Sequence, residues 1–226
     1  MKYFLFHFIG LAVLMIACSG SRTNERIDHI ILAVNDLERG MQQFEELTGV
    51  KPVVGGKHPD SFTQNALVAL EGGAYIEILA PRADADSVPE WIRQFRSITP
   101  MGWAVYTENI ESTRKKLISM GFPVSDIKPG ARTKPDGEIL SWSTMEFAEK
   151  DIQVFPFFIE WGEDVVHPSA SSPTGCSLIK FEIATTDKDM QTLNENFKLG
   201  LSTTSGETKL TLRLRTPKGV VTFPAY

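Results

Sequence analysis

Apolar residues occur along this chain in short blocks separated by polar turns, and the order of the first blocks indicates a compact unit. Residues 27–34 form an isoleucine-rich run, which is typical of a buried strand. A helix start at residues 35–38 has a capping side chain with an acid three residues later, and apolar residues then recur at helical spacing until Gly49. Further strands are expected at 53–54, 65–70 and 74–79, separated by glycine pairs that are typical of hairpin turns. This order predicts one β-α-β-β-β unit.

The same order of elements returns after a proline-bounded connector at residues 81–100, in which a short helix is expected at 89–95. The second unit has a predicted strand at 102–107 and a predicted helix at 110–120, which ends before a glycine. Three more strands are expected near 123–127, 139–148 and 154–159. Because repeated units bury their apolar faces against each other, residues 27–163 are expected to form one α+β domain of paired βαβββ modules with a curved-sheet cleft.

A third and shorter series of elements occupies residues 176–223. A strand at 177–184, a helix at 187–197 and strands near 209–215 and 220–223 indicate a partial βαββ module. We expect this module to pack on the same domain and to complete its sheet. Aligning its helix start with the other two places Lys180 where His29 stands in the first unit, so the third module is not expected to bind a metal.

The first 18 residues have the character of an export signal. Lys2 precedes an almost unbroken apolar run over residues 4–17, which is shorter than the about 20 residues that a membrane-spanning helix needs. The sequence Met-Ile-Ala-Cys that ends at Cys18 resembles a bacterial lipobox, with Cys18 as the lipidated residue, and an ordinary signal peptide is the alternative. With residues 19–26 as a polar tether, the protein is expected to be exported and anchored in the cell envelope by lipid.

Composition narrows the range of partners. The 226 residues carry a formal net charge of −5 and contain no Lys/Arg stripe that would neutralise phosphates, so nucleic acid is not an expected partner. If Cys18 carries lipid, Cys176 stands alone, and we interpret it as a small strand residue rather than a nucleophile. Because both complete modules lie in one chain, a monomer or a loose homodimer is expected.

Three side chains suited to metal binding occur at informative places in the two units. Tyr75-Ile-Glu-Ile78 in the first unit is similar to Phe158-Ile-Glu-Trp161 in the second, and this similarity matches Glu77 with Glu160. A carboxylate inside an apolar strand is costly unless it is paired, neutralised or ligated. If the units pack face to face, His29, Glu77 and Glu160 meet in one cleft as ligands of a divalent metal such as Zn, Mn, Fe, Ni or Co. The alternatives are a hydrogen-bonded strand-end histidine and a buried polar cluster without metal.

At these residues the chain resembles the vicinal oxygen chelate superfamily of glyoxalases, bleomycin-resistance proteins and dioxygenases. The similarity to its glyoxalase-like domain subgroup covers nearly all of residues 27–223 and includes Gly-Gly-Lys-His58-Pro, Arg132-Thr-Lys-Pro-Asp-Gly137, Phe157-Phe-Ile-Glu-Trp161 and His167-Pro168. The resemblance implies paired βαβββ modules whose first and fourth strands supply metal ligands. Gly102 stands at the fourth ligand position and has no side chain to offer, so the chain departs there from the family pattern.

Three further residues are expected in the substrate-binding part of the cleft. His58 is a candidate substrate hydrogen-bonder or further metal ligand, and an exposed loop histidine is the alternative. Arg132 is a candidate for binding a substrate carboxylate or phosphate, with a solvated charge near a turn as the alternative. Trp142 is expected to serve the core and the pocket wall.

The expected function follows from the open coordination positions of a three-ligand site. A small-molecule substrate with two neighbouring oxygens would occupy these positions, and Glu160 or Glu77 would act as general base. We therefore expect a metal-dependent lyase or isomerase. The alternative is a non-catalytic envelope lipoprotein that sequesters a small molecule in the same fold.

Overall fold

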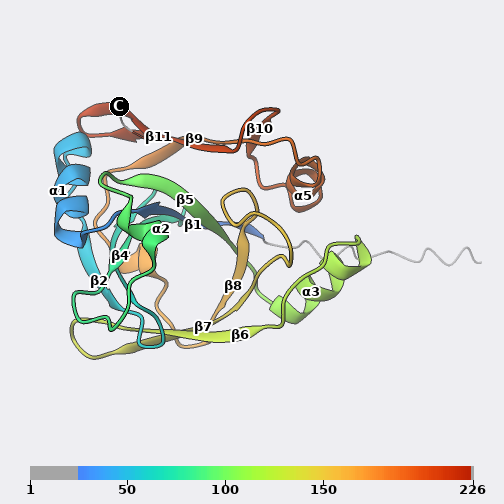
Figure 1. The fold of residues 1–226 in the computed structure, drawn as a ribbon, viewed down its shortest axis with the longest axis horizontal. Helices are drawn as coiled ribbons and strands as arrows, with labels where there is room; N and C mark the ends of the chain where they lie inside the picture. Colours follow the sequence, from blue (N-terminus) through green and yellow to red (C-terminus); the bar gives the residue numbers. More distant parts are fainter. Residues whose placement is uncertain (1–24, 225–226) are drawn as a thin grey trace, which may run out of the picture.

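The computed structural model describes residues 25–224 and shows a closed barrel with a separate sheet against it (Figure 1). The strand order in the barrel is β1-β4-β3-β2-β6-β7-β8-β5, and the second sheet has the order β10-β9-β11-β12. The predicted α+β class is confirmed, with a closed barrel in place of an open curved sheet. Cys18, the predicted signal segment 1–18 and nearly all of the predicted tether 19–26 lie outside the described residues.

The first module has the predicted βαβββ order. It comprises β1 (Arg26–Ala33), α1 (Leu37–Thr48), β2 (Val53–Lys57), β3 (Thr63–Ala69) and β4 (Tyr75–Pro81). The N-cap of α1 is Asp36, whose carboxylate accepts a hydrogen bond from the backbone N–H of Arg39. Gly49 ends α1 with a φ of 78°, a left-handed conformation that glycine adopts at no steric cost. These local signals set the bounds of the helix that follows β1, and β1 pairs in parallel with β4.

The second module repeats this order after a short helix, α2 (Glu90–Arg93). It comprises β5 (Thr99–Tyr106), α3 (Ile110–Ser119), β6 (Lys128–Thr133), β7 (Ile139–Met145) and β8 (Phe157–Trp161). The strand expected at 123–127 was placed wrongly, because Val124 forms only an isolated bridge to Phe147 and the strand lies at 128–133. The apolar residues before β6 pack in the core, whereas β6 itself is polar because it borders a polar cavity.

Two seams join the modules into one barrel. β1 pairs with β5 in antiparallel fashion, and β2 pairs with β6 through Lys57 and Thr133. The glycine pair at 55–56 is therefore not the hairpin turn that was expected but part of β2, where the ladder shifts register. A Cβ on Gly56 would collide with the carbonyl oxygen of Thr133, so the close approach of β2 to β6 requires glycine at this position.

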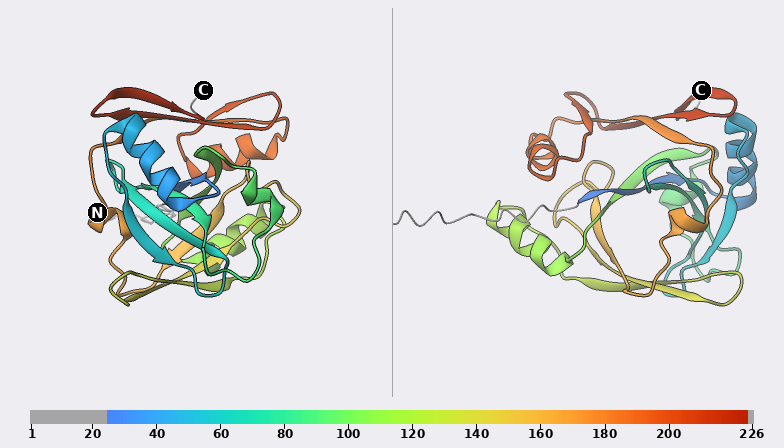
Figure 2. Two further views of the ribbon diagram at one scale, coloured as in Figure 1. Left: turned by 60° about the vertical axis from the view of Figure 1, so that its left-hand side comes forward. Right: turned by 180° about the vertical axis from the view of Figure 1, so that it is seen from behind.

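Helix α1 and the second sheet lie against the outside of the barrel (Figure 2). The main hydrophobic core comprises residues of these elements and of the barrel strands. Along β1, Ile30 and Leu32 belong to this core, and the alternate residues His29 and Ile31 face the barrel interior. Aromatic contacts tie the C-terminal segment to the two modules: Trp103 of β5 against Phe181, Phe44 of α1 against Phe223, and Phe158 of β8 against Phe197. Because these contacts bury the apolar faces elsewhere, the barrel interior is left free for a polar cavity.

The C-terminal segment is not a reduced copy of the modules. It comprises α4 (Pro168–Ser171), β9 (Ser177–Ala184), α5 (Asp189–Phe197), β10 (Ser202–Thr204), β11 (Lys209–Thr216) and β12 (Gly219–Phe223). The parallel partner of β9 is β10, the strand directly after the helix, whereas the parallel partner of β1 is the last strand of its module. The expectation that this segment completes the module sheet was therefore wrong, since it forms a sheet of its own.

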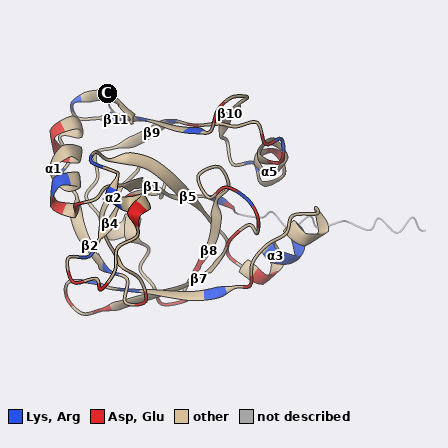
Figure 3. Cartoon of the chain, in the orientation of Figure 1, with Lys and Arg blue, Asp and Glu red and all other residues tan. Residues whose placement is uncertain are grey.

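The outer surface carries charges of both signs. Acidic and basic positions are interspersed along α1 and α3 (Figure 3). Among the described residues, no helix is long and apolar enough to cross a membrane.

Cys176 offers a simple test of the packing between the second sheet and the barrel. Its backbone forms an isolated β-bridge with Leu70, and its exposed fraction is 1%. Burial raises the pKa of its thiol to about 11. We expect iodoacetamide to leave Cys176 unmodified in the folded protein at mildly alkaline pH and to alkylate it in guanidinium, because the thiolate is the nucleophile. Peptide mass spectrometry measures this difference, and rapid labelling of the folded protein would contradict it.

Candidate functional site

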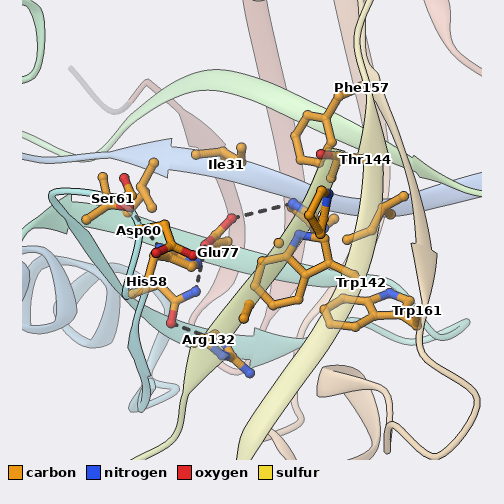
Figure 4. Close-up of a pocket in the computed structure, with 18 of the residues that line it drawn as sticks. Ile31, His58, Asp60, Ser61, Glu77, Arg132, Trp142, Thr144, Phe157 and Trp161 are labelled. Atoms are coloured by element: carbon orange, nitrogen blue, oxygen red, sulfur yellow. Dashed lines mark hydrogen bonds and ion pairs between the residues drawn. The ribbon is translucent and has the colours of Figure 1, made fainter. Parts of the chain in front are cut away.

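The barrel encloses a cavity of about 390 Å³, which is polar on one side and aromatic on the other (Figure 4). This volume lies within the range of small-molecule sites in proteins. The first module supplies most of the polar wall, and β7 and β8 supply the aromatic wall. The residues that line the cavity include His29, Ile31, His58, Asn65, Tyr75, Glu77, Arg132, Trp142, Phe157 and Trp161.

His29 is held from behind by the buried carboxylate of Asp28. The Nδ1 atom of His29 lies 2.7 Å from Oδ1 of Asp28, and Oδ2 of Asp28 accepts a hydrogen bond from the indole N–H of Trp161 at 3.0 Å and lies 3.0 Å from Nε2 of His167. Burial acts to raise the pKa of Asp28, but hydrogen bonds from His167 and His29 hold that pKa well below its ordinary value. An ionised Asp28 keeps the proton of His29 on Nδ1. The lone pair of a neutral His29 then lies on Nε2, on the side of the ring away from Asp28.

Glu77 is the group that His29 faces. The Nε2 atom of His29 lies 3.4 Å from Oε2 of Glu77, whose exposed fraction is 6%. The other carboxylate oxygen, Oε1, accepts a hydrogen bond of 2.6 Å from the side-chain amide of Asn65. The structure thus brings together His29 and Glu77, and one oxygen of the buried carboxylate is fixed while the other faces the imidazole.

His58 lies in the cavity wall and is not an exposed loop residue. Its Nδ1 atom is 2.8 Å from the hydroxyl of Thr63, and its Nε2 atom is 3.9 Å from Oε1 of Glu77. Burial lowers the pKa of His58, and the charge of Arg132 lowers it further, while Glu77 acts in the opposite direction. His58 is therefore a neutral imidazole beside the carboxylate, with Trp142 edge-on to its ring.

Arg132 is buried, with an exposed fraction of 4%, and is not a solvated charge near a turn. Its Nη1 atom donates a hydrogen bond of 3.2 Å to Oδ1 of Asn65. Gly55 makes room for this contact, because a Cβ there would lie 2.6 Å from Nη1 of Arg132. Asn65 therefore connects Arg132 to Glu77 by hydrogen bonds to both side chains.

His29 and Glu77 fit one divalent metal ion as a pair of ligands. Two ligand atoms about 2.1 Å from an ion, at the tetrahedral angle, lie roughly 3.4 Å apart, and His29 Nε2 and Glu77 Oε2 are separated by 3.4 Å. A carboxylate on the other ring nitrogen, as Asp28 provides here, is the usual outer support of a metal-binding histidine. Within residues 25–224, however, no group of three or more His, Cys, Asp and Glu side chains is arranged to hold a metal. Further positions would belong to water, a ligand or His58.

Glu160, the third expected ligand and an expected general base, does not lie in the cavity. In β8 the alternate residues Phe157, Ile159 and Trp161 line it, so Glu160 faces the opposite side of the strand. There its Oε2 atom accepts a hydrogen bond of 2.8 Å from the backbone N–H of Ile110, the first residue of α3. The expectation that Glu160 converges on His29 and Glu77 was therefore wrong.

The helix N-caps show how the two modules correspond. Asp36 caps α1 and Asn109 caps α3, each through its own side chain. His29 lies seven residues before Asp36, and Gly102 lies seven residues before Asn109. Gly102 is therefore the counterpart of His29, as expected from the sequence.

Strand pairing identifies the counterpart of Glu77. Ile31 pairs with Glu77 between β1 and β4, and Ala104, the counterpart of Ile31, pairs with Phe157 between β5 and β8. Phe157 therefore occupies the position in the second module that Glu77 occupies in the first. The second module places a glycine and a phenylalanine where the first places its two metal-type ligands.

Replacing Glu160 with glutamine is expected to leave the cavity unaffected and to lower the free energy of unfolding by at most about 1 kcal/mol. The reason is that Glu160 interacts with the N-terminus of α3, where a negative charge stabilises the helix. Urea unfolding measures the effect. A loss of several kcal/mol, or an altered metal content, would contradict the placement of Glu160 outside the site.

Three residues of the site, Asp28, Asn65 and Tyr75, were not predicted from the sequence. Asp28 precedes His29 directly, and this Asp-His pair at a strand start was the available signal. Asn65 gave no signal, because its contact with Glu77 depends on how β3 and β4 pair. Tyr75 also belongs to the site and stacks on the ring of His29 at 4.7 Å.

Comparison with known proteins agrees with this architecture. A family model described as "Glyoxalase-like domain" matches residues 27–197. No curated protein matches significantly. Among solved structures, a hypothetical protein from Staphylococcus aureus is 17% identical, with 88% of this chain and 85% of that chain covered at a TM-score of 0.59, which supports the fold.

Two further solved structures are more distant. A methylmalonyl-CoA epimerase from Mycobacterium tuberculosis is 21% identical, with 60% of this chain and 85% of that chain covered at a TM-score of 0.42. A hypothetical protein from Bacillus halodurans is 17% identical, with 63% and 99% covered at a TM-score of 0.45.

Proposed function

Because the chain belongs to the glyoxalase-like domain family of the vicinal oxygen chelate superfamily, we propose that its cavity binds a small molecule with two neighbouring oxygens. We propose further that it catalyses a lyase- or isomerase-type reaction in which a proton is transferred with the help of a divalent metal. The observation that carries this proposal is the buried series Asp28–His29–Glu77, which borders the cavity.

Glu77 is the proposed proton-transfer residue. Asn65 holds its Oε1 atom, which leaves Oε2 to face His29 and a bound molecule. Glu160, the other expected base, lies on the opposite side of β8. A positioned carboxylate within hydrogen-bond reach of a substrate proton typically accelerates such a transfer by about 10²–10⁴-fold.

His29 and Glu77 are the residues that would hold the metal, with His58 as the nearest further nitrogen donor. When bound, a divalent metal stabilises negative charge that develops on a substrate oxygen. Asp28 contributes by keeping the proton of His29 on Nδ1, which leaves Nε2 free to ligate.

An aromatic wall lies opposite this cluster. Trp142 and Trp161 pack edge to face with ring centroids 5.3 Å apart, and the indole of Trp142 lies against Gly130, where any Cβ would collide with it. A bound molecule would therefore lie between these rings and the polar groups of the first module.

The test uses α-hydroxycarbonyl compounds such as dihydroxyacetone in heavy water. Proton NMR detects exchange of the hydrogen on the carbon next to the carbonyl, whatever the final product is. Exchange that depends on added Zn, Mn, Ni, Co or Fe supports the proposal. Failure of every metal and of a wider panel of diols and hydroxycarbonyls would contradict it.

The second candidate function is a binding protein that sequesters a small molecule without turning it over. The observation that favours it is that the described residues supply a pair of metal ligands and no group of three. A binding protein of this kind would retain a ligand after purification and show no proton exchange with any metal.

We propose that the protein is exported and anchored to the cell envelope through lipid on Cys18, as the lipobox-like sequence suggests. The barrel closes within one chain, which supports a monomer or a loose homodimer. Replacing Cys18 with serine should abolish incorporation of labelled fatty acid and release the protein from membranes. An unchanged membrane association would contradict the anchor.

A further inference from the structure

A second and smaller cavity adjoins the main one. It measures about 160 Å³ and shares the wall residues Ile31, Glu146 and Phe157 with the main cavity. Its other walls are mostly apolar and include Met101, Gly102, Ile152 and Phe155. Lys150 also lines it, and its ammonium group is paired with Asp187 and Asp189. We call this second cavity the apolar annex.

The annex lies in line with the polar cluster. Glu77 on β4 pairs with Ile31 on β1, and Ile31 pairs with Gly102 on β5, so the three residues form one row across the sheet. Since neighbouring strands are about 4.8 Å apart, Gly102 lies roughly 10 Å from the strand position of Glu77. A bound molecule that reaches Glu77 therefore extends to the annex within a short span.

Gly102 leaves the annex open. A Cβ at this position would meet only the carbonyl oxygen of Ile152 at 3.6 Å and Cδ1 of Ile31 at 3.8 Å, which are ordinary contacts. The position also lacks the left-handed backbone that would favour glycine. Glycine is therefore not needed for the fold here, and the size of residue 102 sets the space in the annex.

The main cavity also contains a buried cation with an unused donor. Arg132 is the one Lys or Arg among the described residues that line this cavity, and its buried Nε atom has no hydrogen-bond partner. A buried donor without a partner is unfavourable, and a carboxylate accepts two parallel hydrogen bonds from a guanidinium. One negative charge suits this site better than two, because Asp60, Glu77 and Glu146 already place three acidic residues in the cavity wall.

Building on the proposed function, we infer that the ligand is a monocarboxylate with an apolar extension. Its carboxylate would pair with Arg132, and its extension would pass Phe157 into the annex. The carbon atoms between these two ends would then lie beside His29 and Glu77. Residue 102 would determine how long an extension the site accepts.

The test is a titration of the intact protein, followed by tryptophan fluorescence, since Trp142 and Trp161 line the cavity. The probes are acetate, hexanoate and their uncharged analogues ethanol and hexanol. We expect hexanoate to bind at least about tenfold more tightly than acetate, because burying each methylene is favourable. Hexanoate should also bind at least about tenfold more tightly than hexanol, because a charged hydrogen bond is lost in hexanol.

Two variants test the two ends of the proposed ligand site independently. Gly102→Leu fills the annex, so hexanoate should lose its advantage over acetate while acetate binding stays unchanged. Arg132→Met should remove the preference for hexanoate over hexanol and keep the effect of chain length. Glu160→Gln is the matched control outside the cavity and should bind like the wild type. If Arg132→Met does not fold, the wild-type comparison of hexanoate with hexanol decides that end of the site.

The inference is overturned if hexanoate binds no better than acetate or hexanol, or if Gly102→Leu keeps the full effect of chain length. These outcomes are distinct from a failure of the proposed function. Proton exchange that depends on Glu77, without a chain-length effect, would remove only the inference. A chain-length effect and a carboxylate preference without any proton exchange would support the inference and contradict the catalytic proposal.

Discussion

Replacing Glu77 with glutamine is expected to slow proton exchange on an α-hydroxycarbonyl substrate by about 10²–10⁴-fold. Glutamine has nearly the same volume, and its amide oxygen still accepts the hydrogen bond from Asn65, so the barrel should stay intact. An amide neither takes up a proton as a carboxylate does nor binds a divalent metal comparably. The rate is measured by proton NMR in heavy water with the same added metal for both proteins, and loss of the metal ligand contributes to the expected decrease.

The control for this prediction is Glu160→Gln, which makes the same chemical change on the opposite side of the barrel wall. It should exchange protons at the wild-type rate. Near-ultraviolet circular dichroism checks that both variants keep their aromatic packing. Equal rates in the wild type and in Glu77→Gln would show that another residue transfers the proton.

Replacing Asp28 with asparagine is expected to weaken metal binding by His29, although Asp28 itself would not contact the metal. Asp28 interacts with donors on His29, Trp161 and His167. The amide group of asparagine donates where a carboxylate oxygen accepts, which favours the proton of His29 on Nε2 and blocks its lone pair. We expect metal affinity to fall by about 10–100-fold, the usual effect of losing such a supporting residue.

The same variant should be less stable than the wild type by about 2 kcal/mol at neutral pH, because hydrogen bonds to a buried charge are lost. The folded-state pKa of Asp28 is depressed, so its stabilising effect is fully present above the ordinary pKa of 3.8 and is lost as pH falls below that value. Urea unfolding should therefore show the difference at neutral pH and a smaller difference in acid.

Nitrogen NMR of the His29 ring distinguishes this role from simple loss of stability. In the wild type the proton should be on Nδ1, and in Asp28→Asn it should be on Nε2. Full metal affinity together with an unchanged ring tautomer in the variant would contradict the role assigned to Asp28.

Much of the fold was predictable because it depends on local signals. The helix starts at Asp36 and Asn109 and the glycine that ends α1 fix the order of elements in both modules. The strand β6 escaped prediction because it reads Lys-Pro-Gly-Ala-Arg-Thr, without the apolar alternation of a strand that faces a hydrophobic core. Its inward residues border a polar cavity, so the usual pattern is absent.

The C-terminal segment was misread for a different reason. Three of its strands and its longer helix were found close to their true positions, but the short strand β10 was missed. Which strands pair is decided by contacts far apart in sequence, because a strand-helix-strand signal is the same whether the first strand pairs with the next strand or with a later one. Local patterns therefore predicted most of the elements and not the topology.

Only the part of the site that the first module contributes was predictable from the sequence. His29 and Glu77 stood out because they interrupt apolar strands, and the structure places them together. Glu160 was matched to Glu77 by a short sequence similarity, whereas strand pairing matches Glu77 with Phe157. An error of three residues reverses the face of a strand, since side chains alternate.

The loss of ligand-type residues in the second module explains why this error could not be recognised from the sequence. With Gly102 and Phe157 at the corresponding positions, no charged residue marked the true register. The same two positions border the apolar annex. One module thus provides the polar half of the site, and the other provides space beside it.

The most direct test of the central claim is elemental analysis of the chain purified without chelators and then supplied with Mn, Zn, Ni, Co or Fe. The account predicts one metal ion per chain in the wild type and in Glu160→Gln, and none in His29→Ala or Glu77→Gln. A wild-type protein that binds none of these metals, or a Glu77→Gln variant that keeps its metal, would contradict the assignment of His29 and Glu77 as the metal-binding pair.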